Sequence, residues 1–219
     1  MDIVIILLAA VLAYMLGSIP TAVWFGKYYY SIDVRDYGSG NSGATNTFRV
    51  LGKKAGIIVM SIDILKGFLA TSLATVLAAY NIVSYDEFIL YKLIFYKLIF
   101  GFLAVLGHIF PFYENFKGGK GVATLLGMML AVDATITIIC LGVFVLVLFL
   151  SKYVSLGSLL ATLAFPLLLF IPRFKPDDPV LIVFGFLMFI VVAITHQKNI
   201  GRLLQGEESR VNIRLRRKR

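Results

Sequence analysis

The chain of 219 residues has few charged side chains and a single cysteine. Asp, Glu, Lys and Arg make up 15% of it, whereas a soluble domain has roughly a quarter. Because Cys140 is the only cysteine, a disulfide within the chain and a cysteine-rich metal site are both excluded. A cleavable signal is also missing: Asp2 replaces the basic start of such a signal, and no small-x-small site follows the first apolar run. We therefore expect that run to be retained as a helix.

Apolar residues are abundant, and they gather in runs long enough to cross a bilayer. Hydrophobic residues make up 59% of the sequence, and its mean hydropathy is +0.89. A spanning helix needs about 20 such residues. The runs cover residues 3–25, 55–80, 89–110, 122–132, 134–150, 156–171 and 180–195. They predict an all-α integral membrane protein with about seven transmembrane helices, which form a single polytopic membrane domain over residues 1–219.

The charged residues indicate how this domain is oriented. If the N-terminus lies outside, the cytoplasmic segments are 27–54, 111–120, the turn at Lys152 and the tail from Gln197, and they hold most of the Lys and Arg residues. The remaining loops are mostly acidic, with Asp86, Glu87, Asp133, Asp177 and Asp178 against Arg173 and Lys175. This asymmetry follows the positive-inside rule and predicts a cytoplasmic C-terminus. It also accounts for the net charge of +9 without a nucleic-acid partner. The short run 122–132 must then cross the membrane, since otherwise the basic tail 214–219 would lie on the outer side.

Three motif loops, 36–54, 107–124 and 196–208, fall on the predicted cytoplasmic side. The first is dense in hydrogen-bond donors, because glycine lets backbone N–H groups turn toward an anion and Arg adds a planar cation. A flexible linker does not need such a cluster, and no Gly-Lys-Ser/Thr follows, so it is not a Walker A motif. We interpret it as a phosphate site formed by Gly38, Ser39, Gly40, Asn41, Ser42, Gly43, Thr45, Asn46 and Arg49.

The second loop opens directly into an apolar helix. A helix N-terminus carries unpaired N–H groups and the positive end of the dipole, so it is an anion site. The alternative without a binding function is a cationic turn among the lipid headgroups, which would not need three glycines. The candidate residues are Lys117, Gly118, Gly119, Lys120 and Gly121, with His108 in support.

The third loop and the second span add ionisable groups for which two interpretations stay open. His196, which shares a face with Asn199 if the helix continues, is either a general base or an interfacial anchor. Asp63 and Lys66 lie at i, i+3 and can pair, either as a scaffold beneath the phosphate site or as a purely structural contact. The pentapeptide 91–95 repeats as 96–100 and has no functional interpretation.

Taken together, the three motifs resemble those of the bacterial glycerol-3-phosphate acyltransferase family that uses acyl phosphate as donor (the PlsY family). The resemblance implies that an acyl group passes from acyl phosphate to the sn-1 hydroxyl of glycerol 3-phosphate, giving lysophosphatidic acid and inorganic phosphate, in the first acylation of phospholipid synthesis. It implies that Ser42, Arg49, His196 and Asn199 are the key residues, that Gly118, Gly119 and Gly121 form the glycerol-3-phosphate loop, and that Glu207 or Glu208 is a structural acid. We expect a monomer in the cell membrane, facing the cytoplasm, with membrane lipid around it and no metal or cofactor.

The His-x-x-x-x-Asp dyad of other acyltransferases is absent, since Tyr113 and Gly201 stand at that offset from the two histidines. We favour direct attack by the glycerol hydroxyl, with His196 or a substrate phosphate oxygen as the proton acceptor. An acyl-Ser42 intermediate is disfavoured, because no histidine lies near Ser42 in sequence. The alternative function is a transporter or flippase for an organophosphate. It would require access from both faces, whereas the polar motifs lie on one side.

Overall fold

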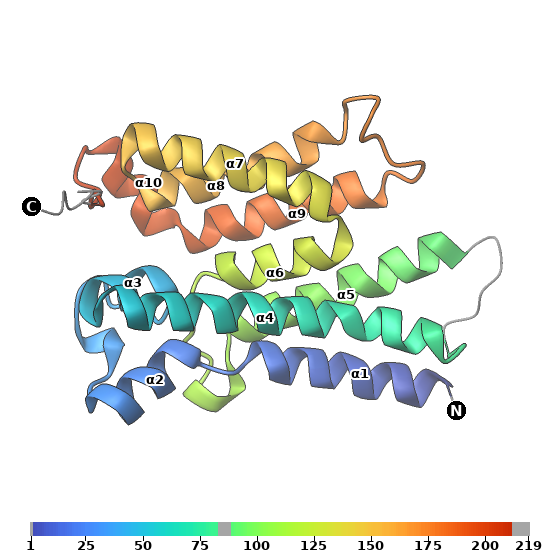
Figure 1. The fold of residues 1–219 in the computed structure, drawn as a ribbon, viewed down its shortest axis with the longest axis horizontal. Coiled ribbons are helices and arrows are strands. Elements are labelled where there is room, and N and C mark those ends of the chain that lie inside the picture. The colour runs from blue at the N-terminus through green and yellow to red at the C-terminus, as the bar shows by residue number, and fades with distance from the viewer. Residues whose placement is uncertain (1, 83–88, 212–219) are drawn as a thin grey trace, which may run out of the picture. The chain divides into compact units, whose positions relative to one another are not determined.

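The computed structural model describes residues 2–82 and 89–211, and every regular element in them is helical (Figure 1). The predicted all-α class is therefore confirmed for this part of the chain. Asp86 and Glu87, used above for the topology, lie outside the described residues, as does the basic tail 214–219. The chain forms two compact units, Met1–Ala134 and Thr135–Arg219.

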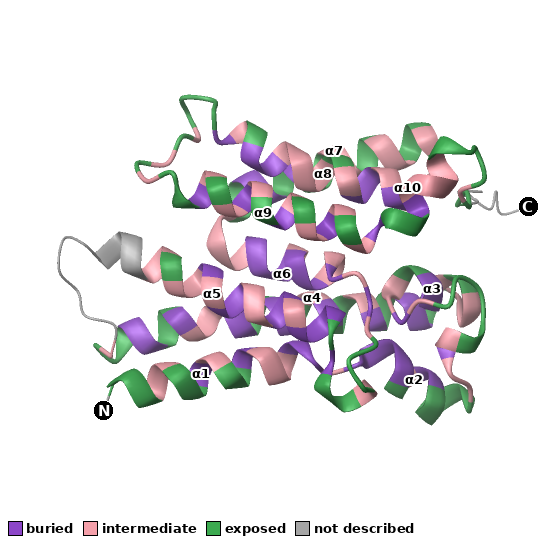
Figure 2. Cartoon of the chain, turned by 180° about the vertical axis from the view of Figure 1, so that it is seen from behind, coloured by how far each residue is buried: buried purple, intermediate pink, exposed green. Residues whose placement is uncertain are grey.

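Unit 1 is organised around one long helix. Its elements are α1 (Asp2–Gly17), α2 (Thr21–Tyr30), the 3-10 turn η1 (Val34–Asp36), α3 (Ala44–Val50), α4 (Gly52–Ala79), α5 (Ile89–Ile109), the 3-10 turn η2 (Phe112–Glu114) and α6 (Val122–Val132). Helix α4 packs against α1, α3, α5 and α6. Its buried residues follow helical spacing along one face, whereas Ile57, Leu65 and Leu69 on the other face are exposed (Figure 2). An apolar outer face suits a helix in contact with lipid tails.

Small residues allow the helices of unit 1 to approach closely, as in other membrane bundles. A Cβ at Gly17 would collide with the backbone of Ala104 on α5. A Cβ at Gly127 would collide with the carbonyl of Ile64, so α6 lies directly on α4. The position of α6, which begins at the second motif loop, is therefore set by backbone contact with α4.

Unit 2 contains α7 (Ala134–Ser151), α8 (Val154–Leu168), α9 (Val180–Thr195) and α10 (Gln197–Leu204). Helix α8 packs against α9, and α10 contacts both of them. Gly185 on α9 faces Pro166 on α8, where a Cβ would come within 3.0 Å of the proline ring. These contacts place the third motif at one end of α8 and α9.

Within residues 2–82 and 89–211, three helices are long and apolar enough to cross a membrane, in the segments Gly52–Ala79, Leu93–Glu114 and Ala134–Ser151. The number rises to five if each bent pair, α1 with α2 and α9 with α10, counts as one span. Helices α6 and α8 are apolar but shorter. The protein is thus a helical membrane protein, while the count of seven and the orientation of the termini stay predictions.

The predicted single helix over 3–25 is wrong. Helix α1 ends at Gly17, the chain resumes at Thr21, and the two helices are bent by 45°. Pro20 explains the break, because proline has no N–H to donate and disfavours helical backbone at the residue before it. The break frees the carbonyl of Ile19 from the helix.

A buried polar network fills the space around this break. The Asp63 carboxylate on α4 pairs with Lys66 Nζ at 2.9 Å and accepts a hydrogen bond from Thr21 Oγ1 at 3.0 Å. Lys66 Nζ also donates to the Ile19 carbonyl at 2.8 Å. Asp63 is 1% exposed and Lys66 4%, so the predicted i, i+3 pair is confirmed. The same pair also satisfies the carbonyl that the break in the first helix exposes.

The second copy of the pentapeptide repeat has a structural role. Lys97 on α5 donates through Nζ to the carbonyl of Ala131 at 2.8 Å, in the last turn of α6. A cation there satisfies a helix-end carbonyl and interacts favourably with the negative end of the helix dipole. In the first copy, the side chains of Tyr91 and Lys92 lie outside the described residues, whereas Phe95 is exposed.

The buried pair leads to the first prediction. Lys66→Met leaves the Asp63 carboxylate without its cation, so the free energy of unfolding should fall by about 3–5 kcal/mol, the usual cost of breaking a buried ion pair. Denaturant unfolding of the detergent-solubilised protein measures this loss. Leu65→Met introduces the same side chain at the exposed neighbouring position and should change stability little. Equal stability of both variants would contradict the structural importance of the pair.

Candidate active site

Asn46 organises the first motif loop. Its side chain is buried, and Oδ1 accepts hydrogen bonds from Ser39 N at 2.9 Å and Ser39 Oγ at 3.1 Å. Nδ2 donates to the carbonyls of Val34 at 2.7 Å and Tyr37 at 3.1 Å. Two donor hydrogens and two lone pairs are thus all used. Asn46 therefore shapes the loop in this conformation, and its predicted place among the phosphate-binding residues stays a prediction.

Arg49 remains available on this loop. Gly38 has a φ of +64°, and a Cβ there would strike Asn46 Oδ1 and lie 3.2 Å from Arg49 Cδ. Glycine at this position therefore lets the loop turn under both side chains. The Arg49 side chain is exposed, and among the described residues it makes no hydrogen bond or ion pair. Ser42 is buried just before the first turn of α3. A free guanidinium beside a tight glycine turn suits an incoming phosphate.

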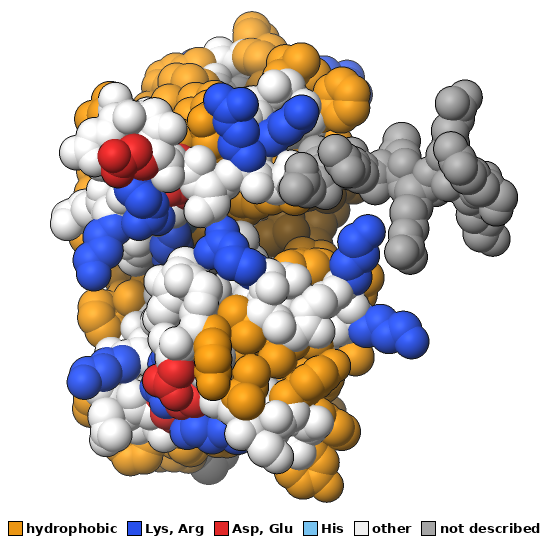
Figure 3. Space-filling model, turned by 90° about the vertical axis from the view of Figure 1, so that its left-hand side faces the viewer, with side chains coloured by type: hydrophobic (Ala, Val, Ile, Leu, Met, Phe, Trp, Pro, Cys, Tyr) orange, Lys and Arg blue, Asp and Glu red, His pale blue; other side chains and the backbone are white. Residues whose placement is uncertain are grey.

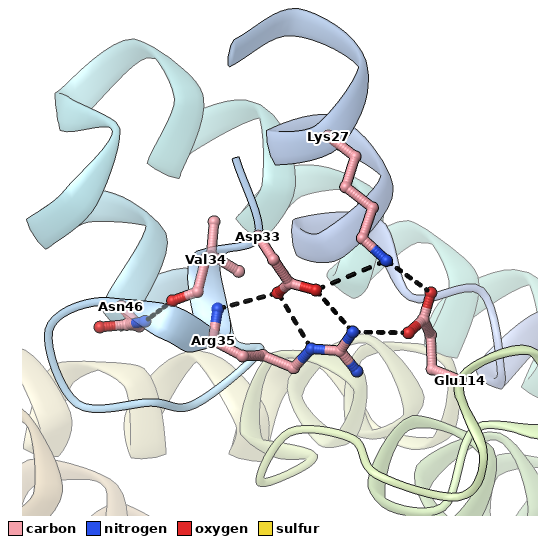
Figure 4. Close-up of polar contacts among 6 residues, drawn as sticks. All are labelled: Lys27, Asp33, Val34, Arg35, Asn46 and Glu114. Carbon is pink, nitrogen blue, oxygen red and sulfur yellow. Dashed lines mark hydrogen bonds and ion pairs between the residues drawn. The ribbon is translucent and has the colours of Figure 1, made fainter. Parts of the chain in front are cut away.

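Four charged side chains connect the approach to this loop with the approach to the second (Figure 4). Arg35 on η1 donates to both oxygens of Asp33, through Nε at 3.0 Å and Nη2 at 2.6 Å. The same Nη2 lies 2.7 Å from Glu114 Oε2 on η2. Lys27 on α2 completes the group, 3.4 Å from Asp33 and 3.7 Å from Glu114. The hydrogen bonds from Arg35 hold the pKa of Asp33 down to about 2, and those carboxylates raise the pKa of Arg35.

Gly118 and Gly119 of the second loop pack closely against the end of α5. The N–H of Gly118 donates to the Ile109 carbonyl, and that of Gly119 to the His108 carbonyl, each at 3.1 Å. A Cβ at Gly118 would collide with the His108 carbonyl, and one at Gly119 with His108 Nε2. Both N–H groups therefore have backbone partners in this conformation, and the role of Gly118 and Gly119 in the glycerol-3-phosphate loop stays a prediction. Their side-chain hydrogens leave room for His108 beneath the loop.

The anion-binding capacity of the second loop lies at the start of α6. Gly121 precedes the helix with a φ of +78°, which favours glycine, and its carbonyl accepts the helical hydrogen bond from Leu125. The N–H groups of Val122 and Ala123 precede that first bond, so they face outward from the helix end. Lys117 and Lys120 flank this end in sequence. Basic side chains also reach the surface at the end of unit 1 from which both loops extend (Figure 3).

His108 connects the second loop with the buried network. Its Nδ1 lies 3.1 Å from Thr124 Oγ1 on α6 and 3.7 Å from Asp63 Oδ1. Its Nε2 faces the Cα of Gly119. The supporting role predicted for His108 has a physical basis here, because one ring contacts α4, α6 and the glycine turn.

In unit 2, His196 lies at the bend between α9 and α10, where the helix axis turns by 70°. The helix does not continue straight through this residue, so the condition under which His196 would share a helical face with Asn199 is not met. His196 Nδ1 lies 2.8 Å from the Val192 carbonyl. A carbonyl oxygen only accepts hydrogen bonds, so Nδ1 carries a proton, and Nε2 is the nitrogen that accepts one in the neutral ring.

Glu208 fixes the position of Asn199. Its Oε1 accepts hydrogen bonds from Asn199 Nδ2 at 2.6 Å and Ser155 Oγ at 2.8 Å, and its Oε2 from Arg202 Nε at 2.7 Å. Burial alone would raise the pKa of the Glu208 carboxyl, but these donors outweigh it and lower the pKa. Glu207 is exposed. Between the two glutamates left open by the sequence, Glu208 is therefore the structural acid.

The candidate residues thus form two groups. Unit 1 brings together the first two loops, and unit 2 brings together His196, Asn199 and Glu208. Sequence reasoning missed Asp33, Arg35 and Glu114. The close spacing of Asp33 and Arg35 was a signal for their local pair, but no pattern in the sequence indicated the contact with Glu114. No group of three potential metal ligands occurs in 2–82 and 89–211.

Glu208→Gln should lower the free energy of unfolding by about 1.5–3 kcal/mol at neutral pH, the value of hydrogen bonds to a charged group. Because folding lowers this pKa, the contribution is present above the ordinary glutamate pKa and is lost as the pH falls. Chemical unfolding at several pH values should show that the difference in unfolding free energy between the variant and wild type becomes smaller below about pH 4.3. Glu207→Gln, the matched control, should stay near wild type. A gap independent of pH would exclude the carboxylate as its cause.

Known proteins resemble this chain over nearly its full length. The family model described as glycerol-3-phosphate acyltransferase matches residues 7–206. A glycerol-3-phosphate acyltransferase of Enterococcus faecalis is 44% identical, covering 100% of this chain and 96% of that protein. The corresponding protein of Chlorobium phaeobacteroides is 41% identical, covering 92% and 94%.

Two solved structures have the same fold. The crystal structure of PlsY (YgiH), an integral membrane glycerol 3-phosphate acyltransferase, in its glycerol 3-phosphate form has a TM-score of 0.81 and 36% sequence identity, covering 94% of this chain and 96% of that one. Its lysophosphatidic acid form has a TM-score of 0.78 and 35% identity, covering 94% and 95%. The chain therefore belongs to the glycerol-3-phosphate acyltransferase family and is a membrane-embedded acyltransferase.

Proposed function

We propose that the protein transfers a fatty acyl group from acyl phosphate to the sn-1 hydroxyl of glycerol 3-phosphate. The products are lysophosphatidic acid and inorganic phosphate. The observation that carries this proposal is the pair of anion-binding features in unit 1, the free Arg49 guanidinium and the basic N-terminus of α6. Both substrates carry a phosphate, so two such features match the reaction. The glycerol 3-phosphate and lysophosphatidic acid forms of the similar PlsY structure support this substrate and product.

The roles follow from the chemistry of each loop. The turn Gly118–Gly121 presents the N–H groups at the start of α6 to the phosphate of glycerol 3-phosphate, with Lys117 and Lys120 adding charge. Arg49 presents its planar donors to the phosphate of the acyl donor, with Ser42 beside it. Ser39, Gly40, Asn41, Gly43 and Thr45 complete the wall of the first loop. No metal or cofactor is required by these steps.

In the proposed mechanism, the hydroxyl oxygen attacks the acyl carbonyl carbon and the bond from that carbon to the phosphate oxygen breaks. The hydroxyl proton passes to a phosphate oxygen or to His196 Nε2. An acyl phosphate is a mixed anhydride with a good leaving group, so positioning and charge stabilisation can supply much of the rate. We favour a positioning role for His196, because a backbone carbonyl rather than a carboxylate holds its Nδ1.

The proposal places the site on the cytoplasmic face of the cell membrane. Residues 1–219 would form one polytopic domain with about seven crossings, an outside N-terminus and the three motif loops inside. The distribution of Lys and Arg supports this arrangement. Such a domain takes glycerol 3-phosphate from the cytoplasm and the acyl chain from the bilayer, and it acts as a monomer.

Purified protein in detergent micelles tests this function. With acyl phosphate and glycerol 3-phosphate it should release lysophosphatidic acid and phosphate in equal amounts, without any gradient. An acyl thioester in place of acyl phosphate should give no product. Absence of product from acyl phosphate, together with transport of an organophosphate by the protein in sealed vesicles, would instead support the transporter.

Gly119→Ala should chiefly raise the KM for glycerol 3-phosphate. The added methyl would strike the His108 ring, so the turn that leads into α6 must shift. Steady-state kinetics with each substrate varied in turn measure the change. Gly142→Ala, where nothing lies within 4 Å of the new Cβ, is the matched control. A selective rise in the KM for acyl phosphate would mean that the two loops are assigned to the wrong substrates.

His196→Gln should retain much of the activity that His196→Ala loses if the ring positions a substrate. An amide can donate a hydrogen bond but cannot take a proton at neutral pH. General-base catalysis would instead make both variants slower by about 10²–10⁴-fold in kcat and would remove the acidic limb of the pH–rate profile. Measuring kcat across pH for both folded variants separates the two roles.

A further inference from the structure

One guanidinium joins the segments that lead into the two anion loops. Arg35 Nη2 is shared between Asp33 Oδ2 at 2.6 Å and Glu114 Oε2 at 2.7 Å (Figure 4). Arg35 lies just before the turn at Gly38, and Glu114 just before the Lys117–Gly121 turn. The link therefore connects two polar turns at their entrances rather than two rigid helices.

The groups around the Arg35–Glu114 ion pair fix the direction in which the guanidinium points. The Glu114 side chain is 13% exposed and that of Arg35 26%, so water screens the contact less than it screens an open surface pair. Asp33 holds the guanidinium by two bonds from its own segment, which leaves Nη2 pointing at η2. Lys27 neutralises the remaining charge but lies 3.7 Å from Glu114 and has no planar fork. Of these two cations, Arg35 is thus the one that can fix the angle as well as the distance between the segments.

The same region has an aromatic contact that limits how η2 can move. Trp24 on α2 packs against Tyr113, which precedes Glu114, with ring centroids 5.5 Å apart. This contact anchors η2 on α2 but lies on the far side of Glu114 from the Lys117–Gly121 turn in sequence. Of these two contacts, the ion pair is the nearer to that turn in sequence.

We propose that the Arg35–Glu114 ion pair is a positioning contact that sets the first and second loops at the separation at which the glycerol hydroxyl, rather than water, reaches the acyl carbonyl. This inference rests on the proposed function, because it assigns one phosphate to each loop. Neither residue touches a reacting atom. Their effect is on where the two bound phosphates lie relative to each other.

The chemistry of the donor provides a direct readout. Attack by the glycerol hydroxyl breaks the acyl carbon–oxygen bond to phosphate and forms an ester. Attack by water breaks the same bond and forms a free fatty acid, and the proton goes to the departing phosphate. Both routes release one phosphate, but only the first gives lysophosphatidic acid. The ratio of lysophosphatidic acid to phosphate therefore reports positioning and does not depend on how much of the protein is folded.

Glu114→Ala removes the link and leaves the Asp33–Arg35 pair intact. We expect the transfer rate to fall by about 10-fold or more, as for a small misplacement of reactants, while phosphate release falls less, so that phosphate exceeds lysophosphatidic acid. Glu114→Gln, which keeps a neutral acceptor for Arg35, should restore part of the ratio. Asp36→Ala is the matched control: Asp36 is an exposed acid next to Arg35 on η1, and its side chain has no partner among the described residues. This variant should keep the wild-type ratio of lysophosphatidic acid to phosphate.

The outcomes separate the two levels of inference. If wild type makes no lysophosphatidic acid from acyl phosphate, the proposed function fails. If wild type makes equal amounts of both products and Glu114→Ala does so too, or loses both to the same degree, the positioning role is overturned. Arg35→Lys serves as the second variant if Glu114→Ala does not fold, because a lysine keeps the charge without the shared fork, and the same shift in ratio is expected.

Discussion

The Asp63 carboxylate is the point on which the polar structure of unit 1 depends. A charge buried among membrane helices has no bulk water to solvate it and must be paired and hydrogen-bonded. Asp63 meets this condition through Lys66 on α4 itself, Thr21 at the start of α2 and His108 on α5. Lys66 in turn satisfies the Ile19 carbonyl. The break in the first helix is therefore stabilised by α4, which supplies partners for the Ile19 carbonyl and the Thr21 hydroxyl.

The same constraint reaches the two loops. The His108 ring, held near Asp63 and Thr124, occupies the space that a side chain at position 119 would take. In the first loop, Asn46 uses all its hydrogen bonds on its own neighbours. Much of what looks in sequence like a set of phosphate donors thus holds the loops in shape. Our proposal therefore assigns anion binding to Arg49 and the start of α6, because this internal bonding leaves both of them available.

Local spacing predicted some of these features well. Apolar runs gave the helical membrane class, and the i, i+3 spacing gave the Asp63–Lys66 pair. Pro20 was also a signal for the break in the first helix. Hydropathy is averaged over many residues, however, so the prediction merged the two helices into one span. The Arg35–Glu114 contact and the choice of Glu208 over Glu207 were not predictable, because each depends on how distant segments fold back on one another. Hydropathy and spacing carry no information about such long-range contacts.

Unit 2 shows how the third motif reaches its geometry despite the bend at His196. The bend separates His196 from the straight part of α10, while Glu208 folds back to hold Asn199, Arg202 and Ser155. The ring and the amide are thus fixed by different partners, a backbone carbonyl for His196 and a carboxylate for Asn199. A carbonyl orients an imidazole but stabilises its cation less than a carboxylate does. This arrangement agrees with the positioning role that we propose for His196. An activated acyl donor does not need a strong general base.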